Sequence, residues 1–127
     1  GVSDVDINEL IKYHKEQKTI VTLTAVKPEG RFGVLDIEGN KVRSFREKNQ
    51  NDMGWINAGF MVIKPEIFDY IDGDDVIFER QPLETVANEG QLAVYKHHGF
   101  WQCMDTMKDK MKLEELWTND KAPWKVW

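Results

Sequence analysis

The sequence predicts an α/β protein in which a mixed β-sheet is flanked by helices. Runs rich in β-branched and aromatic residues alternate along the chain with segments whose apolar residues recur at helical spacing. Two of the strand-like runs are joined by a short turn, which predicts a β-hairpin inserted into the sheet. The length of 127 residues suits one domain with a hydrophobic core and is too short for two.

The elements begin with a helix over residues 5–17, for which Ser3 and Asp4 are the expected N-caps. His14 should be half-exposed on this helix, rather than a metal ligand, because no second ligand lies one turn away. The chain has no initial Met, which predicts either a cut inside a longer protein or removal of Met before Gly1.

Three runs in the first half of the chain predict strands. Residues 19–26 are rich in β-branched side chains and alternate only in part, as in a strand buried on both faces. Residues 32–37 and 42–47 alternate and are joined by Glu-Gly-Asn, which predicts the hairpin. Residues 55–63 form the most apolar run and predict a central strand.

The second half predicts further helices and strands. Pro65 opens a short helix. The acidic segment 72–75 lacks the alternating ligand spacing of a calcium loop and is expected to be a solvated turn. The short helix that Pro65 opens should bury Ile67, Phe68 and Ile71. Two later helices are expected over residues 78–88 and 107–117, and two later strands over residues 91–97 and 99–105.

Composition and charge exclude several classes of function. A net charge of −5 argues against a general nucleic-acid binder, which needs a basic face. No apolar tract is long enough to cross a membrane, so neither nucleic acid nor a membrane is an expected partner. The single cysteine, Cys103, excludes an internal disulfide and favours a reducing, cytoplasmic setting.

A dense polar cluster surrounds the central strand. Glu47 and Lys48 end one strand, and Asn57 and Gly59 interrupt the next. A buried Asn must have its amide satisfied, so Asn57 predicts a hydrogen-bond network or a ligand. Spacing alone leaves open the alternatives that Glu47 and Lys48 are solvated charges and that Gly59 marks a bulge or a close backbone approach.

The last strand and the C-terminal tail carry further signals. Asp105 ends the strand where the last helix begins, and either Asp105 or Thr106 should cap that helix. The aromatic tail over residues 122–127 should pack on its own domain or, as we slightly prefer, on a neighbouring subunit.

Three segments resemble the sugar-phosphate nucleotidylyltransferases. They are Phe-Arg-Glu-Lys at 45–48, Gly-Trp-Ile-Asn-Ala-Gly-Phe at 54–60 and Gly-Phe-Trp-Gln-Cys-Met-Asp-Thr at 99–106. Over essentially the whole chain, the similarity is to the C-terminal part of this Rossmann-like nucleotidyltransferase fold. Within the family, the chain looks most like the members that make CDP-glucose for lipopolysaccharide O-antigen. The resemblance implies a homo-oligomer at full length.

The same resemblance identifies what the chain lacks. The family's glycine-rich nucleotide-binding loop with its basic residue has no counterpart here, and a Gly-Asp pair that supplies a magnesium ligand would end just before Gly1. The resemblance therefore implies a sugar-phosphate-binding part without the nucleotide-binding part, inactive by itself. The alternative is a non-catalytic sugar-phosphate-binding or oligomerisation module.

In the complete enzyme, the resemblance implies that glucose 1-phosphate attacks the α-phosphorus of CTP and gives CDP-glucose and pyrophosphate, with Mg²⁺ as cofactor. Two residues match catalytic positions. Asp105 matches a family carboxylate that binds the metal, and Lys48 matches the lysine that reaches the sugar phosphate.

Other residues match substrate-binding positions of the family. Glu47 and Asn57 match groups that hydrogen-bond glucose hydroxyls, and Gly59 would let the sugar approach the backbone closely. Thr106 is a weaker candidate for substrate binding, and Trp101 is expected to be core or a pocket wall rather than a direct ligand.

Overall fold

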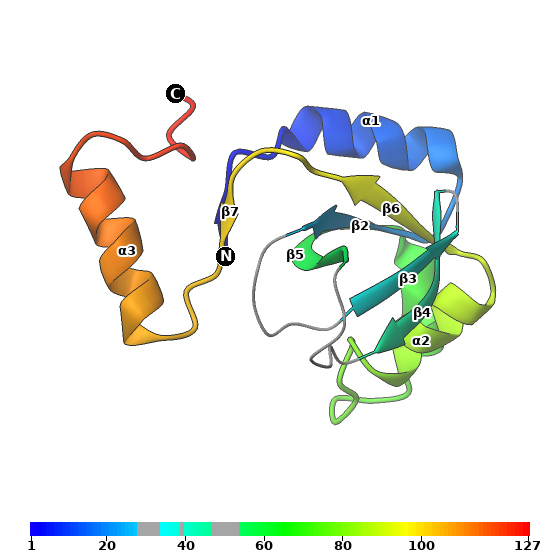
Figure 1. Ribbon diagram of the computed structural model, residues 1–127. Helices are drawn as coiled ribbons and strands as arrows, with labels where there is room; N and C mark the ends of the chain where they lie inside the picture. The colour runs from blue at the N-terminus through cyan, green and yellow to red at the C-terminus, as the bar shows by residue number, and fades with distance from the viewer. Residues whose placement is uncertain (28–33, 39, 47–53) are drawn as a thin grey trace.

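A computed structural model of the chain describes residues 1–27, 34–38, 40–46 and 54–127 (Figure 1). Most of the elements gather around one sheet, whereas the last helix lies to one side of it (Figure 1). In chain order the elements are β1 (Val2–Ser3), α1 (Ile7–Gln17), β2 (Val21–Val26), β3 (Val34–Glu38), β4 (Lys41–Arg46), β5 (Ile56–Ile63), the 3-10 helix η1 (Pro65–Tyr70), α2 (Gln81–Asn88), β6 (Leu92–Lys96), β7 (Trp101–Gln102) and α3 (Met107–Thr118).

The main sheet is mixed, as predicted, and β2 lies at its centre. This strand pairs antiparallel with β5 and parallel with β6, and all its side chains are buried. The predicted hairpin is confirmed by the antiparallel pairing of β3 with β4. Single residue pairs join β3 to β5 and β4 to β6, so the strands close into a small barrel in the order β2-β5-β3-β4-β6, which the sequence did not predict.

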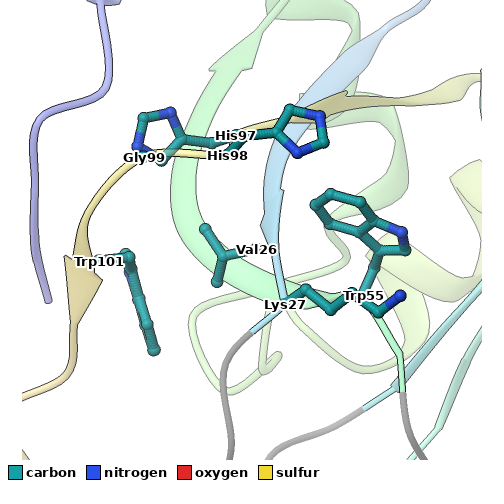
Figure 2. A pocket seen from close by; sticks show the side chains of 7 residues that line it. All are labelled: Val26, Lys27, Trp55, His97, His98, Gly99 and Trp101. Carbon is teal, nitrogen blue, oxygen red and sulfur yellow. The ribbon is translucent and has the colours of Figure 1, made fainter.

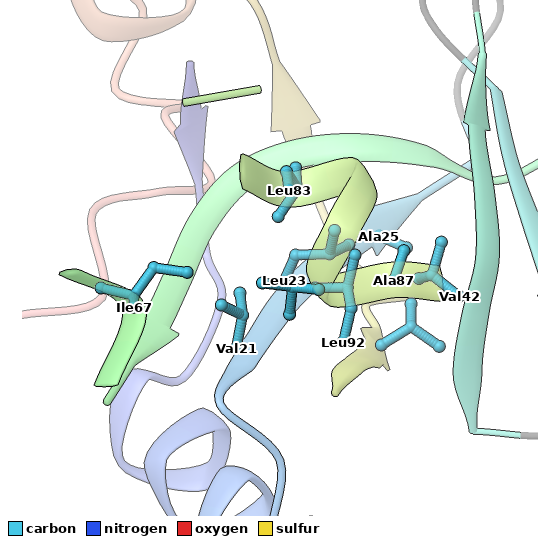
Figure 3. Packing of buried hydrophobic residues seen from close by; sticks show 10 residues of the cluster. Val21, Leu23, Ala25, Val42, Ile67, Leu83, Ala87 and Leu92 are labelled. Carbon is cyan, nitrogen blue, oxygen red and sulfur yellow. The ribbon is translucent and has the colours of Figure 1, made fainter. Parts of the chain in front are cut away.

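The main hydrophobic core lies between β2 and α2. Figure 3 shows side chains from these elements and from β6 pointing toward one another. The helix α2 buries one stripe of its surface, in agreement with its apolar spacing, although it begins at Gln81 rather than at residue 78. The cluster includes Val21, Leu23, Ala25, Leu83, Val86, Ala87 and Leu92.

The start of the chain differs from the prediction. The N-cap of α1 is Asp6, whose carboxylate accepts a hydrogen bond from the backbone N–H of Glu9 at 3.1 Å. Ser3 and Asp4 do not cap the helix, because both are held by the segment that precedes β7. The Ser3 hydroxyl donates to the carbonyl of Phe100 at 2.6 Å.

His14 was expected to be half-exposed, and this prediction is wrong. The side chain is only 5% exposed, and its Nδ1 lies 2.7 Å from Thr22 Oγ1. The reason is that α1 lies along the main sheet, so this helix position faces the fully buried strand β2 (Figure 1).

The prediction for the segment after β5 is only partly confirmed. Pro65 does open a helix, but the helix is of the 3-10 type. Ile67 is buried and Ile71 is half-buried, whereas Phe68 is 72% exposed and contradicts the prediction. A 3-10 helix has three residues per turn, so the neighbours Ile67 and Phe68 point in different directions and only one of them faces the core.

The C-terminal region is less sheet-like than predicted. The strand expected over residues 99–105 is reduced to β7, which pairs with β1. In the tail, Trp124 stacks on Trp117, with ring centroids 6.3 Å apart, and approaches Phe100 at 5.8 Å. Part of the tail therefore packs on its own chain, while Trp127 remains 79% exposed. Among the described helices, none is both long and apolar enough to cross a membrane.

Candidate functional site

The predicted site residues fall into three groups. Glu47 and Lys48 lie outside the described residues. Asn57 and Gly59 lie on β5, in the middle of the main sheet. Asp105 comes after β7 and immediately before α3. The structure thus places the second and third groups on different elements.

Asn57 is half-buried and has a local partner. Its side-chain oxygen accepts a hydrogen bond from the backbone N–H of Gly59 at 2.9 Å. The amide oxygen is therefore satisfied within β5 and does not itself require a ligand.

Gly59 lies at an irregularity of the sheet. The register of β5 against β2 shifts between the pairs Leu23–Met61 and Ala25–Asn57, which confirms the alternative of a bulge. The φ angle of Gly59 is 92°, in the region that favours glycine, and a Cβ there would meet no atom within 4 Å. Glycine is required by the backbone conformation, and the space beside it is open.

Trp101 connects β7 to this part of β5. Its indole N–H donates to the carbonyl of Ala58 at 3.2 Å, and its ring packs against the small cluster of Val26, Ile56 and Ala58. The expectation of a pocket wall agrees with this position. The hydrogen bond from Trp101 to Ala58 also fixes the position of β7 beside β5, and therefore the position of Asp105, which follows β7.

The carboxylate of Asp105 is exposed and takes no part in capping α3. Thr106 is the N-cap, because its hydroxyl accepts from the backbone N–H of Asp109 at 3.2 Å. Asp109 completes a capping box with the backbone N–H of Thr106. Of the two expected caps, only Thr106 has this role.

Asp109 also holds the turn that presents Asp105. One of its oxygens accepts the backbone N–H of Asp105 at 3.1 Å, and this bond is the largest cause of the lowered pKa of Asp109. The same oxygen lies 3.5 Å from the sulfur of Cys103. Burial, followed by the hydrogen bond and charge of Asp109, raises the pKa of the Cys103 thiol. The backbone N–H groups of Asp105 and Thr106 thus both donate to the Asp109 carboxylate and are not available to a ligand anion.

The chemistry of Asp105 fits one ligand of a hard divalent cation. In the part of the chain that the structure covers, no three His, Cys, Asp or Glu side chains form a metal-binding group. Mg²⁺ is commonly held by only one or two carboxylates together with substrate phosphates. Asp105 could supply one such carboxylate, because its oxygens accept no hydrogen bond from the residues that the structure describes.

The pairing of β1 with β7 brings the start of the chain beside the strand that leads to Asp105. Val2 pairs with Gln102, and Ser3 pairs with Trp101. Beside this pair, His97 Nε2 lies 2.8 Å from the Asp4 carboxylate. A Cβ on Gly99 would lie 2.5 Å from the same Asp4 oxygen, so this contact needs glycine at position 99.

A pocket of about 340 Å³ opens where the parallel strands β2 and β6 end (Figure 2). Sequence reasoning assigned no role to most of its lining residues. The signal that could have found them is the pair of strand ends, since ligands of α/β sheets bind outside the carboxyl ends of parallel strands. The lining includes Val26, Lys27, Trp55, His97, His98 and Trp101.

Comparisons with known proteins agree with this fold. Residues 2–113 match the nucleotidyl transferase family, and the chain belongs to that family. It is 50% identical over 127 residues to the glucose-1-phosphate cytidylyltransferase of Salmonella typhi. It is 28% identical to the mannose-1-phosphate guanyltransferase of Saccharomyces cerevisiae, in an alignment of 127 positions that covers 95% of this chain and 35% of that protein.

The solved structure of HddC from Yersinia pseudotuberculosis has the same fold, with a TM-score of 0.71 at 21% identity. The match covers 91% of this chain and 51% of that structure. The chain likewise spans about half the length of the Salmonella typhi relative, with 100% of this chain matching 49% of that protein. Its position in the C-terminal half stays a prediction.

Proposed function

We propose that the chain is the sugar-phosphate-binding part of a glucose-1-phosphate cytidylyltransferase. The complete enzyme would join glucose 1-phosphate to the cytidylyl group of CTP and release pyrophosphate. The observation that carries this proposal is the identity of 50% with the Salmonella typhi enzyme over all 127 residues. The nucleotide-binding loop would lie outside the 127 residues, so we expect no turnover from the chain alone.

In this reaction, an oxygen of the sugar phosphate attacks the α-phosphorus of CTP, and pyrophosphate leaves from the opposite side. Such a reaction needs positioning and compensation of negative charge more than covalent help from the protein. Lys48 would provide one positive charge for the sugar phosphate. Glu47, Asn57 and Gly59 would line the sugar, with Thr106 as a weaker contact.

Asp105 would be one ligand of Mg²⁺, which offsets charge on the phosphates when bound. Its exposed carboxylate lies in the turn that Asp109 holds and accepts no hydrogen bond from the described residues, which supports this role.

A chimera tests the proposal. The 127 residues would replace the matching segment of the Salmonella typhi enzyme, and pyrophosphate release from CTP and glucose 1-phosphate would be measured. We expect turnover that depends on both substrates. A chimera with a cooperative melting transition but no turnover would favour the non-catalytic binding or oligomerisation module. The cytoplasmic setting and the homo-oligomer stay predictions.

A further inference from the structure

We propose that Asp109 is a positioning residue, whose carboxylate holds the turn that carries Asp105 and so sets where the Asp105 side chain stands for metal binding. The inference rests on the proposed function, because it takes Asp105 as a ligand of Mg²⁺. It deepens that function by giving a role to Asp109, a residue to which the proposed reaction assigns none.

The carboxylate of Asp109 contacts the segment that leads from β7 into α3 (Figure 1). Its Oδ2 accepts hydrogen bonds from the backbone N–H of Asp105 at 3.1 Å and from that of Thr106 at 3.2 Å. The Cys103 thiol approaches the same oxygen at 3.5 Å, and the side-chain amide of Gln102 approaches Oδ1 at 3.4 Å. One side chain in the first turn of α3 thus contacts four of the five residues that precede this helix.

These contacts exceed what the cap of α3 requires. In a capping box, the side chain at the third helical position bonds the backbone N–H of the N-cap, which here is Thr106. The contacts with Gln102, Cys103 and the N–H of Asp105 lie before the N-cap and satisfy no backbone group of the helix. Their common effect is to fix the backbone from which the Asp105 side chain projects.

Asp105 depends on this backbone for its position. Its side chain is exposed and accepts no hydrogen bond from the residues that the structure describes. A metal ligand must be held close to its binding geometry, and residues that orient a ligand contribute strongly to metal affinity. By holding the N–H of Asp105, Asp109 restricts the positions that the Asp105 carboxylate can reach.

Gln102 extends the contact from α3 to the small sheet of β1 and β7. This residue belongs to β7 and pairs with Val2 of β1, while its side-chain amide approaches Asp109. The helix α3 lies to one side of the main sheet, so this contact joins it to the strand that leads to Asp105 (Figure 1). Asp109 therefore fixes Asp105 relative to β1 and β7 as well as to its own helix.

The test measures metal affinity without turnover, in the chimera with the Salmonella typhi enzyme. The probe is Mn²⁺, which prefers the same oxygen ligands as Mg²⁺, and electron paramagnetic resonance of the free ion gives the bound fraction. Asp109→Ala removes all four contacts and should weaken Mn²⁺ binding about tenfold or more, the loss typical of residues that orient a metal ligand.

Two further variants control for the fold and for charge. Asp109→Asn keeps one oxygen that can accept from the N-cap, so it should retain the fold and show a smaller loss of affinity. Glu115→Ala removes an exposed carboxylate from the same helix and should leave Mn²⁺ binding unchanged. Thermal melting of each variant checks that the fold is retained.

A combined variant shows whether Asp109 acts through Asp105. Asp105→Asn should itself weaken Mn²⁺ binding, and the addition of Asp109→Ala should then cause little further loss, because the carboxylate that Asp109 positions is gone. In turnover, Asp109→Ala should raise the Mg²⁺ concentration needed for half-maximal activity and leave the KM for glucose 1-phosphate unchanged. A role confined to the helix cap would lower the melting temperature without changing the affinity for Mn²⁺.

The proposal is overturned if Asp109→Ala and Asp109→Asn bind Mn²⁺ as tightly as Glu115→Ala, or if the losses in Asp105→Asn and Asp109→Ala add in full. Weaker binding in Asp105→Asn alone would keep the proposed metal ligand and remove Asp109. Unchanged binding in Asp105→Asn would overturn the proposed metal ligand together with this inference. A chimera that binds Mn²⁺ through Asp105 and releases no pyrophosphate would contradict the proposed reaction alone.

Discussion

His97 and Asp4, ninety-three positions apart in the sequence, form a contact of 2.8 Å that ties the start of the chain to the turn after β6. Gly99 leaves the space for this contact, because any Cβ there would lie 2.5 Å from the Asp4 oxygen. The contact stands beside the pairing of β1 with β7, which leads to Asp105.

Gly99→Ala should therefore destabilise the chain by about 1 to 3 kcal/mol, as measured by urea unfolding. Gly73→Ala is the control and should have little effect, because a Cβ at Gly73 meets nothing within 4 Å. In an Asp4→Ala background the cost of Gly99→Ala should shrink, since the nearest clashing atom is gone. Equal costs in both backgrounds would contradict the crowding argument.

The buried His14 should make the fold sensitive to mild acid. Burial, and then the nearby charge of Lys64, lowers the pKa of His14 from its usual 6.5. Below that pH the unfolded chain binds a proton that the folded chain resists, so the free energy of unfolding should decrease as the pH falls from about 7 to 5.

The measurement is urea unfolding across that pH range for the wild type and for His14→Gln, which stays neutral. The variant should show a flatter dependence on pH. An unchanged slope in His14→Gln would show that another group is responsible.

Substitutions of Thr106 and of Asp105 should have different effects on the free energy of unfolding. Thr106→Ala removes the hydroxyl that caps α3 and should cost about 1 kcal/mol. Asp105→Asn should change the free energy of unfolding by less than about 0.5 kcal/mol, because its exposed side chain makes no hydrogen bond among the described residues. A loss in Asp105→Asn as large as that in Thr106→Ala would mean that Asp105 has a structural role.

Lys48 is tested in the chimera with the Salmonella typhi enzyme. Lys48→Ala should lower kcat/KM for glucose 1-phosphate at least about tenfold, the effect of losing one charge-assisted contact of about 1.5 to 3 kcal/mol. Lys12→Ala, at an exposed position on α1, is the control and should retain full activity. Unchanged kinetics in Lys48→Ala would remove this residue from the proposed mechanism.

Local patterns predicted much of the fold. The β-branched run of β2, the apolar spacing of α2 and the turn of the hairpin each reflect neighbours in the sequence, and all three elements are found. Burial that depends on distant packing was harder to predict. His14 is buried because α1 lies on β2, and Phe68 is exposed because η1 turns with a 3-10 geometry.

In the candidate site too, features that depend on neighbours in the sequence were predictable, and features that depend on distant packing were not. The position of Asp105 at a junction of strand and helix, and the glycine bulge on β5, follow from short segments. The pocket around Trp55 could not be predicted in this way, because Lys27 and His98 line the same pocket only when β2 and β6 pair in parallel. Two side chains that lie far apart in the sequence, such as Asp4 and His97, form no local pattern from which their contact could be predicted.

The most direct test of the account is the magnesium dependence of pyrophosphate release by the chimera, with and without Asp105→Asn. If Asp105 binds the metal while Thr106 serves the fold, Asp105→Asn should raise the Mg²⁺ concentration needed for half-maximal activity about tenfold or more, with an unchanged melting temperature. A chimera carrying Asp105→Asn that needs no more Mg²⁺ than its parent would contradict the account.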